Sequence, residues 1–204
     1  MKKILILDFD GTVIDSNYIK EKAILEFIKR KYKVNILEKL DYFQLQKMTR
    51  YQLIDLATKS SISLNEKKEI DLEIKDRVLD SKIDPNLINI YFFCLKSKIK
   101  IYLVSNTPND ALFEIVNSLK ISHYFHEIIG KKPGLEKSCI FKKIIRDENV
   151  KPNDILSVGD NINDYFASKE NKIPFHGIGN STLNCLKNTI PITDTLIGII
   201  KSLK

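Results

Sequence analysis

A short apolar strand that ends in two carboxylates constrains the fold of this chain more than any other feature. Residues 4–7, Ile-Leu-Ile-Leu, form an unbroken apolar run, which is typical of a strand buried on both faces of a parallel sheet. Asp8 and Asp10 follow on the same side of the extended segment, and Gly11 permits a sharp turn after them. Carboxylates at the edge of a core need charge compensation, for which a hard cation such as Mg²⁺ is suited. A solvated strand end with a turn glycine is an equally compatible interpretation of this stretch alone.

Strand patterns and helix patterns alternate along most of the remaining chain. Further strands are predicted at 100–105, 126–130, 154–158 and 174–178, and helices at 138–148 and 196–203. Two more helices are predicted to open at Asp84-Pro85 and at Thr107-Pro108, because each pair offers an N-cap side chain followed by proline at the first helical position. This alternation implies an α/β fold with a parallel sheet, right-handed crossovers and helices on both faces.

The segment between residues 16 and 82 has a different pattern, with helical periodicity, no predicted strand and no glycine. A helix is predicted from Tyr18 to Tyr32, and sequences typical of capping boxes begin at Thr49 and at Ser63. Apolar residues that mark one helix face are Ile19, Ala23, Ile24, Phe27 and Ile28 in the first helix, and Ile70, Ile74 and Val78 in the last. About 65 helical residues are too many for a crossover, so they predict a small helical domain.

Polar residues follow three of the predicted core strands. Asp8 and Asp10 follow the first strand, residues 105–106 (Ser-Asn) end the second, and Asp160 and Asp164 follow the strand at 154–158. In an open parallel sheet, ligands bind outside the carboxyl ends of the strands. The sequence therefore predicts a functional site at this edge of the sheet.

Three of these segments resemble motifs of the haloacid dehalogenase-like superfamily of phosphohydrolases. Residues 8–16, Asp-Phe-Asp-Gly-Thr-Val-Ile-Asp-Ser, resemble its opening motif, residues 105–107 its second motif and residues 159–164 its fourth. The resemblance implies a three-layer Rossmann-like parallel-sheet core, at 1–14 and 84–204, with an inserted all-helical C1-type cap domain at 15–83. Candidate specificity residues in the cap are Tyr18, Lys20, Tyr42, Arg50 and Tyr51.

The resemblance also implies a Mg²⁺ site built on the aspartates. Asp8, Asp160 and the main-chain oxygen of Asp10 would be direct ligands, while Asp164 would bind directly, act through water or orient the other ligands. The spacing of Asp160 and Asp164 supports this, because one helical turn separates them and both can face one cavity.

The same resemblance implies that phosphate is bound by Ser105, Asn106 and a lysine of the third motif. Lys137 stands 23 residues before Asp160 and begins a predicted helix, as in phosphoserine phosphatase-like members. Lys132 precedes a proline, as in many other members, but stands 28 residues before Asp160. Lys137 is the preferred candidate and Lys132 the alternative.

The implied reaction is hydrolysis of a small phosphomonoester through an aspartyl-phosphate. Asp8 would be the nucleophile and Asp10 the general acid and base, and an acid at position 10 favours phosphate chemistry over dehalogenation. Thr12 would brace the turn, orient Asp10 and contribute to the phosphate site. A phosphomutase of the same superfamily is the alternative enzyme, and a non-catalytic regulatory or binding module is the alternative from another class.

Charge and composition limit the kinds of partner that this chain is expected to bind. The net charge is +7, divided between +3 at residues 15–83 and +4 in the remainder, without a basic arm, so nucleic acid is disfavoured. The three cysteines are far apart and match no metal-site spacing, which favours reduced thiols in the cytoplasm. The first apolar run is too short for a signal peptide and no run could span a membrane. The expected partner is a small phosphorylated metabolite, and the sequence predicts no oligomeric state.

Overall fold

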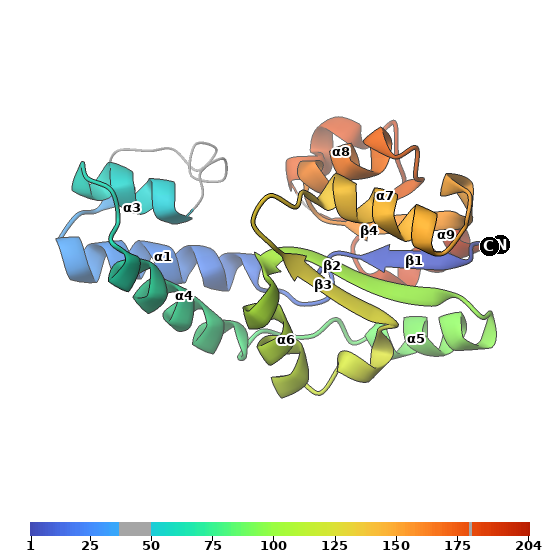
Figure 1. The fold of residues 1–204 in the computed structure, drawn as a ribbon, viewed down its shortest axis with the longest axis horizontal. Helices are drawn as coiled ribbons and strands as arrows, with labels where there is room; N and C mark the ends of the chain where they lie inside the picture. The colour runs from blue at the N-terminus through green and yellow to red at the C-terminus, as the bar shows by residue number, and fades with distance from the viewer. Residues whose placement is uncertain (37–49, 180) are drawn as a thin grey trace. The chain divides into compact units, whose positions relative to one another are not determined.

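The computed structural model describes residues 1–36, 50–179 and 181–204 (Figure 1). The chain divides into two compact units, Met1–Asp15 with Lys82–Lys204, and Ser16–Ser81. The first unit contains the sheet and the second contains helices. Within the described ranges, no helix combines the length and the apolar character that crossing a membrane would require.

In the described part of the first unit, six parallel strands form one sheet, in the order β3-β2-β1-β4-β5-β6 (Figure 1). Their bounds are β1 Ile4–Leu7, β2 Lys100–Pro108, β3 Glu127–Lys131, β4 Ile155–Gly159, β5 Phe175–Ile178 and β6 Ile192–Thr193. The predicted parallel α/β sheet is thereby confirmed. β6 was not predicted, because two residues are too few to show a period.

β1 is the strand that carries the first two aspartates, and it lies in the middle of the sheet. It pairs with β2 on one side and β4 on the other, and Leu7 lies opposite Leu103 and Val158. The four residues of β1 are completely buried, as the apolar run predicted. Asp8 continues the ladder by donating its main-chain N–H to the Val158 oxygen at 2.9 Å, so its side chain emerges at the carboxyl edge between two neighbouring strands.

Helices cover both faces of this sheet. They are α5 Leu87–Lys96, α6 Asn109–Ser118, α7 Lys137–Asp147, α8 Ile162–Glu170 and the short α9 Ile200–Leu203. Figure 1 shows α7 and α8 on one side of the sheet and α5 and α6 on the other. On the α7 side, Ile140, Phe141 and Ile144 pack against Ile4 and Ile6 of β1 in one apolar cluster. This packing holds the first residue of α7 close to the carboxyl end of β1.

The two predicted helix starts with a proline were wrong in detail. α5 begins at Leu87 rather than at the proline. The Asp84 carboxylate accepts from the Asn86 N–H at 2.7 Å and from the Leu196 N–H at 3.0 Å. These two hydrogen bonds stabilise a turn before the helix. At the other site, β2 continues as far as Pro108, so Thr107 belongs to a strand and α6 begins one residue after the proline.

The second unit consists, in its described part, of α1 Asn17–Tyr32, α3 Arg50–Thr58 and α4 Leu64–Val78. The predicted helix at 18–32 is confirmed, and its residues Ala23, Phe27 and Ile28 are buried, as are Ile70, Ile74 and Val78 of α4. The proposed capping box at Thr49 lies outside the described residues.

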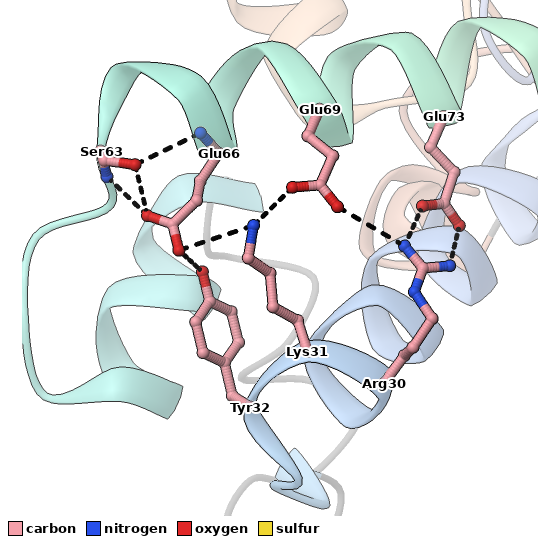
Figure 2. A network of polar contacts seen from close by, with 7 residues as sticks. All are labelled: Arg30, Lys31, Tyr32, Ser63, Glu66, Glu69 and Glu73. Carbon is pink, nitrogen blue, oxygen red and sulfur yellow. Dashed lines mark hydrogen bonds and ion pairs between the residues drawn. The ribbon is translucent and has the colours of Figure 1, made fainter.

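The start of α4 and its contact with α1 show how local signals define this unit (Figure 2). Ser63 caps α4, since its hydroxyl accepts from the Glu66 N–H at 3.3 Å and the Glu66 carboxylate accepts from the Ser63 N–H at 2.9 Å. The capping box predicted there is confirmed. Along the same face, Arg30 pairs with Glu73 at 2.8 Å, and the Tyr32 hydroxyl donates to Glu66 at 2.6 Å. Exposed pairs of this kind contribute only ~0.2–1 kcal/mol each, so the buried apolar residues supply most of the stability.

Candidate active site

Four charged side chains meet at the carboxyl edge of the sheet. Asp8 follows β1, Asp160 follows β4, Asp164 lies in the first turn of α8 and Lys137 is the first residue of α7. All four are buried, with exposed fractions between 3% and 9%. The Lys137 ammonium bridges two carboxylates, at 2.7 Å from Asp8 Oδ1 and 2.6 Å from Asp164 Oδ1.

The three carboxylates form a set that fits a divalent cation. Asp8, Asp160 and Asp164 each offer an oxygen that lies within 4.8 Å of the other two. With one ammonium among them, three ionised carboxylates leave a formal charge of −2 in a buried place, which requires compensation. An all-oxygen donor set with this charge suits a hard cation such as Mg²⁺.

Burial and repulsion between like charges define the electrostatics of this cluster. Burial raises the pKa of Asp8 well above its usual range, and the neighbouring carboxylates of Asp164, Asp160 and Asp10 add to this against the attraction of Lys137. For Lys137, burial alone would lower the pKa, but the carboxylates of Asp164 and Asp8 overcome it and the net pKa is raised. Lys137 therefore stays protonated, and a bound cation would favour the ionised form of Asp8.

The position of Asp164 follows from the local sequence after β4. Asn161 caps α8, and its side chain accepts from the Asn163 N–H at 3.0 Å while Asp164 Oδ2 accepts from the Asn161 N–H at 3.2 Å. Gly159 makes room for this arrangement, because a Cβ at that position would lie 2.5 Å from Asp164 Oδ2. Both oxygens of Asp164 thus hold hydrogen bonds, which suits a residue that orients the other groups.

The two candidate lysines lie in different surroundings. Lys137 is buried among the carboxylates, whereas Lys132 is exposed in the loop between β3 and α7. That loop turns tightly, with Lys132 bridged to Leu135 and Gly134 at a φ of +72°. The structure therefore brings Lys137, and not Lys132, to the acidic cluster.

Asp10 contacts hydroxyl groups from β2. Its Oδ2 accepts from Thr107 Oγ1 at 2.8 Å and, at the longer distance of 3.5 Å, from Ser105 Oγ. Ser105 and Thr107 are both buried and the intervening Asn106 is exposed, as the alternation of side chains along a strand requires. The sequence places Thr107 in the second-motif segment 105–107, but its strand was predicted to end at 105 and Thr107 to cap a helix, so the contact with Asp10 was not predicted. Thr107 stands two residues after Ser105, and this spacing places both side chains on the same face of an extended strand.

The turn after β1 places the remaining residues of the first motif. Gly11 has a φ of +73° and donates its N–H to the Ile14 oxygen at 2.7 Å, which closes the turn. Thr12 is buried, and within the described part of the chain its hydroxyl has no hydrogen-bond partner. Thr12 therefore contributes to the turn through packing and through its main-chain N–H, which donates to the Phe9 oxygen at 3.4 Å. A second missed contact is Thr182, whose hydroxyl donates to the main-chain oxygen of Asp160 at 2.9 Å.

The candidate specificity residues belong to the helical unit and have varied surroundings. Tyr18 is 70% exposed, and Tyr42 lies outside the described residues. Arg50 and Tyr51 both contact Asp71 of α4, at 2.9 Å from the Arg50 Nε and 2.7 Å from the Tyr51 hydroxyl. These two contacts join α3 to α4, so they have a structural function in the unit.

Comparison with known proteins shows the family of this chain and agrees with its fold. The family model described as haloacid dehalogenase-like hydrolase matches residues 5–178, so this chain belongs to the haloacid dehalogenase-like hydrolases. The resemblance given by the sequence motifs is thereby confirmed. No curated protein matches the sequence.

Three of the solved structures that resemble this chain cover 98–100% of it at low identity. A haloacid dehalogenase-like hydrolase of family IA, variant 3, from Entamoeba histolytica HM-1:IMSS is 17% identical with a TM-score of 0.83, covering 100% of this chain and 97% of that one. A predicted phosphoglycolate phosphatase from Haemophilus somnus 129PT is 18% identical with a TM-score of 0.76, covering 100% and 98%. CbbY from Rhodobacter sphaeroides, in complex with phosphate, is 13% identical with a TM-score of 0.73, covering 98% and 97%. At these identities the likeness shows the fold alone.

Proposed function

We propose that this chain is a Mg²⁺-dependent phosphatase that hydrolyses a small phosphomonoester through an aspartyl-phosphate intermediate. The observation that carries the proposal is the buried lysine that bridges Asp8 and Asp164, within a set of three carboxylates at the carboxyl edge of the sheet. Membership of the haloacid dehalogenase-like hydrolases supports it, as does the phosphate bound to the CbbY structure of the same fold.

In the first step, an oxygen of the Asp8 carboxylate attacks phosphorus and the bond between phosphorus and the ester oxygen breaks. Asp10, two residues further along the chain, donates a proton to the leaving oxygen, so that an alcohol departs. Lys137 stabilises the charge that develops on the transferred phosphoryl group, because its ammonium already lies 2.7 Å from the nucleophilic carboxylate.

In the second step, Asp10 is ionised and takes a proton from a water molecule. The oxygen of that water attacks phosphorus, and the bond between phosphorus and the Asp8 oxygen breaks. Inorganic phosphate leaves and the Asp8 carboxylate is regenerated. One residue thus acts as acid and then as base, which returns the site to its starting protonation state.

Phosphate oxygens would be held by Ser105, which is buried at the end of the regular part of β2, together with Lys137. Asp8, Asp160 and the main-chain oxygen of Asp10 would hold Mg²⁺. Asp164, the third carboxylate of the set, would act on the metal through water and orient Lys137 and the turn at Asn161. When bound, Mg²⁺ would offset the negative charge that the carboxylates and the substrate bring together.

The test is phosphate release from a panel of sugar phosphates, phosphorylated short acids and nucleoside monophosphates, with Mg²⁺ and again with excess chelator. Release that depends on the metal, and that Asp8→Asn abolishes in a folded protein, would support the proposal. No release from any compound by the folded protein would contradict it. Transfer of a phosphoryl group within a sugar phosphate would then identify a phosphomutase, and a ligand bound without turnover would identify a binding module.

A further inference from the structure

The carboxyl group of Asp10 is anchored by the side chain of Thr107, a residue of the second-motif segment 105–107 for which the sequence predicted no role of its own. The Thr107 hydroxyl donates to Asp10 Oδ2 at 2.8 Å, and Thr107 is only 9% exposed. The Ser105 hydroxyl reaches the same oxygen at 3.5 Å, which is the long limit of a hydrogen bond. Thr107 therefore makes the stronger of these two contacts.

The backbone around Thr107 is held firmly enough to give this contact a fixed geometry. Its N–H donates to Ser105 Oγ at 3.0 Å, and beyond a register shift between Val104 and Pro108 the strand pairs again with β3, with Pro108 opposite Lys131. Gly130 of β3 lies directly against this segment, since a Cβ there would be 2.9 Å from the Thr107 oxygen and 2.8 Å from the Asn109 nitrogen. The Gly130 N–H also donates to Asn109 Oδ1 at 3.1 Å, which fixes the start of α6 after the strand.

The hydroxyl groups of Ser105 and Thr107 have different roles, because their surroundings differ. In the proposed mechanism Ser105 holds a phosphate oxygen, and its contact with Asp10 is already long. The contact of Thr107 is short and directed at the carboxyl group of Asp10. A carboxyl group that is not held rotates about its side-chain torsions, and proton transfer requires the donor within hydrogen-bond reach of the leaving oxygen.

We propose that Thr107 is a positioning residue for Asp10: its hydroxyl holds Oδ2 so that the carboxyl group is oriented for proton transfer to the leaving oxygen. This inference rests on the proposed phosphatase function and adds to it a residue that acts through Asp10 rather than on the substrate. Its consequence is that the effect of losing the hydroxyl depends on how strongly the leaving group needs a proton.

The experiment compares Thr107→Val, which removes the hydroxyl at nearly constant volume, with Thr107→Ser, which retains it. The substrates are phenyl phosphate, whose leaving phenolate is basic enough to benefit from a proton, and p-nitrophenyl phosphate, whose leaving group is a weaker base and departs without a proton. For Thr107→Val we expect kcat/KM on phenyl phosphate to fall by about 10- to 100-fold, and on p-nitrophenyl phosphate by less than about threefold. Thr107→Ser should stay within about threefold of the wild type on both esters.

A second comparison uses Asp10→Asn, which removes the proton donor itself. In that background, Thr107→Val should cause no further loss on phenyl phosphate, because a residue that acts through Asp10 has nothing left to position. Far-ultraviolet circular dichroism and thermal melts establish that each variant is folded, and Thr107→Ala replaces Thr107→Val if the valine variant does not fold.

The outcomes separate the inference from the function on which it rests. Equal losses on the two esters, or no loss on either, would overturn the positioning role while leaving the phosphatase intact. Full additivity of the two substitutions would overturn it as well. A folded wild-type protein that releases phosphate from neither ester, nor from the metabolite panel, would instead overturn the proposed function and the inference with it.

Discussion

Replacing Gly159 by alanine should impair catalysis by moving one carboxylate of the cluster. The new Cβ would lie 2.5 Å from Asp164 Oδ2 and 2.7 Å from Asp164 Cγ, whereas ordinary contact begins at 3.4 Å. The carboxyl group must therefore retreat by about 0.9 Å, or the strand must yield by a similar amount. Asp164 holds Lys137 at 2.6 Å and the Asn161 N–H at 3.2 Å, so a retreat of this size weakens both contacts.

The expected magnitudes follow from this geometry. Inserting a methyl group into a well-packed place costs about 1–3 kcal/mol, which corresponds to a fall in Tm of roughly 2–12 °C for a chain of this size. A misplacement of about 1 Å in catalytic machinery lowers the rate by about 100-fold. We therefore expect a folded protein with kcat reduced about 100-fold and a higher Mg²⁺ requirement.

The assay is steady-state phosphate release with p-nitrophenyl phosphate over a Mg²⁺ titration, alongside a thermal melt. Gly134→Ala is the matched control, because Gly134 has a φ of +72° and a Cβ there would meet nothing within 4 Å. That substitution adds about 1–2 kcal/mol of backbone strain without touching the cluster, so kcat should stay within about twofold. A Gly159→Ala protein with wild-type kcat and wild-type Mg²⁺ dependence would refute the reasoning, as would an equal loss in the control.

Two further predictions address a charge and a pH dependence. Lys137→Ala should lower kcat by about 100-fold or more, because it removes the ammonium that bridges Asp8 and Asp164. Lys132→Ala, at an exposed position, should keep kcat within about twofold of the wild type. Equal losses of kcat in phosphate-release assays would contradict the assignment of Lys137. The His176 ring contacts the hydroxyls of Ser202 and Thr193 at 2.8 and 3.0 Å, and burial lowers its pKa. Between the two pKa values, the histidine is therefore protonated in the unfolded chain and neutral in the folded protein. The free energy of unfolding of the wild type should therefore fall as the pH drops from about 6.5 through the lower pKa of the folded state, by up to ~1.4 kcal/mol per pH unit. In urea unfolding between about pH 7.5 and 5.5, His176→Gln should show a flatter dependence of stability on pH than the wild type. Parallel pH profiles of the two proteins would contradict this prediction.

The features that the sequence predicted correctly are those whose cause is local. The apolar run of β1 needs no partner to be recognised, and neither does the reciprocal capping box of Ser63 and Glu66, which forms within one turn of α4. The alternation of strand and helix patterns predicted the parallel sheet. Because parallel strands end at one edge, it also predicted that Asp8 and Asp160 would come together.

Features that depend on competition between distant segments were not predictable in this way. Thr107 followed by proline is a sound helix start, yet the pairing of β2 with β3 extends the strand and directs the hydroxyl to Asp10. The Asp84 carboxylate would suit an N-cap, but it also accepts from the Leu196 N–H, from a segment more than a hundred residues away, and the helix begins later.

The amino-acid sequence by itself therefore determined the type of fold, the edge of the sheet that carries the site and the aspartates that meet there, because periodicity, capping and strand ends are properties of neighbouring residues. The spacing to Asp160 favoured Lys137 but left Lys132 as an alternative, and tertiary structure decided which lysine joins the aspartates. Lys132 and Lys137 are equivalent in charge, and only the packing of α7 on β1 buries the second beside Asp8 and leaves the first in solvent.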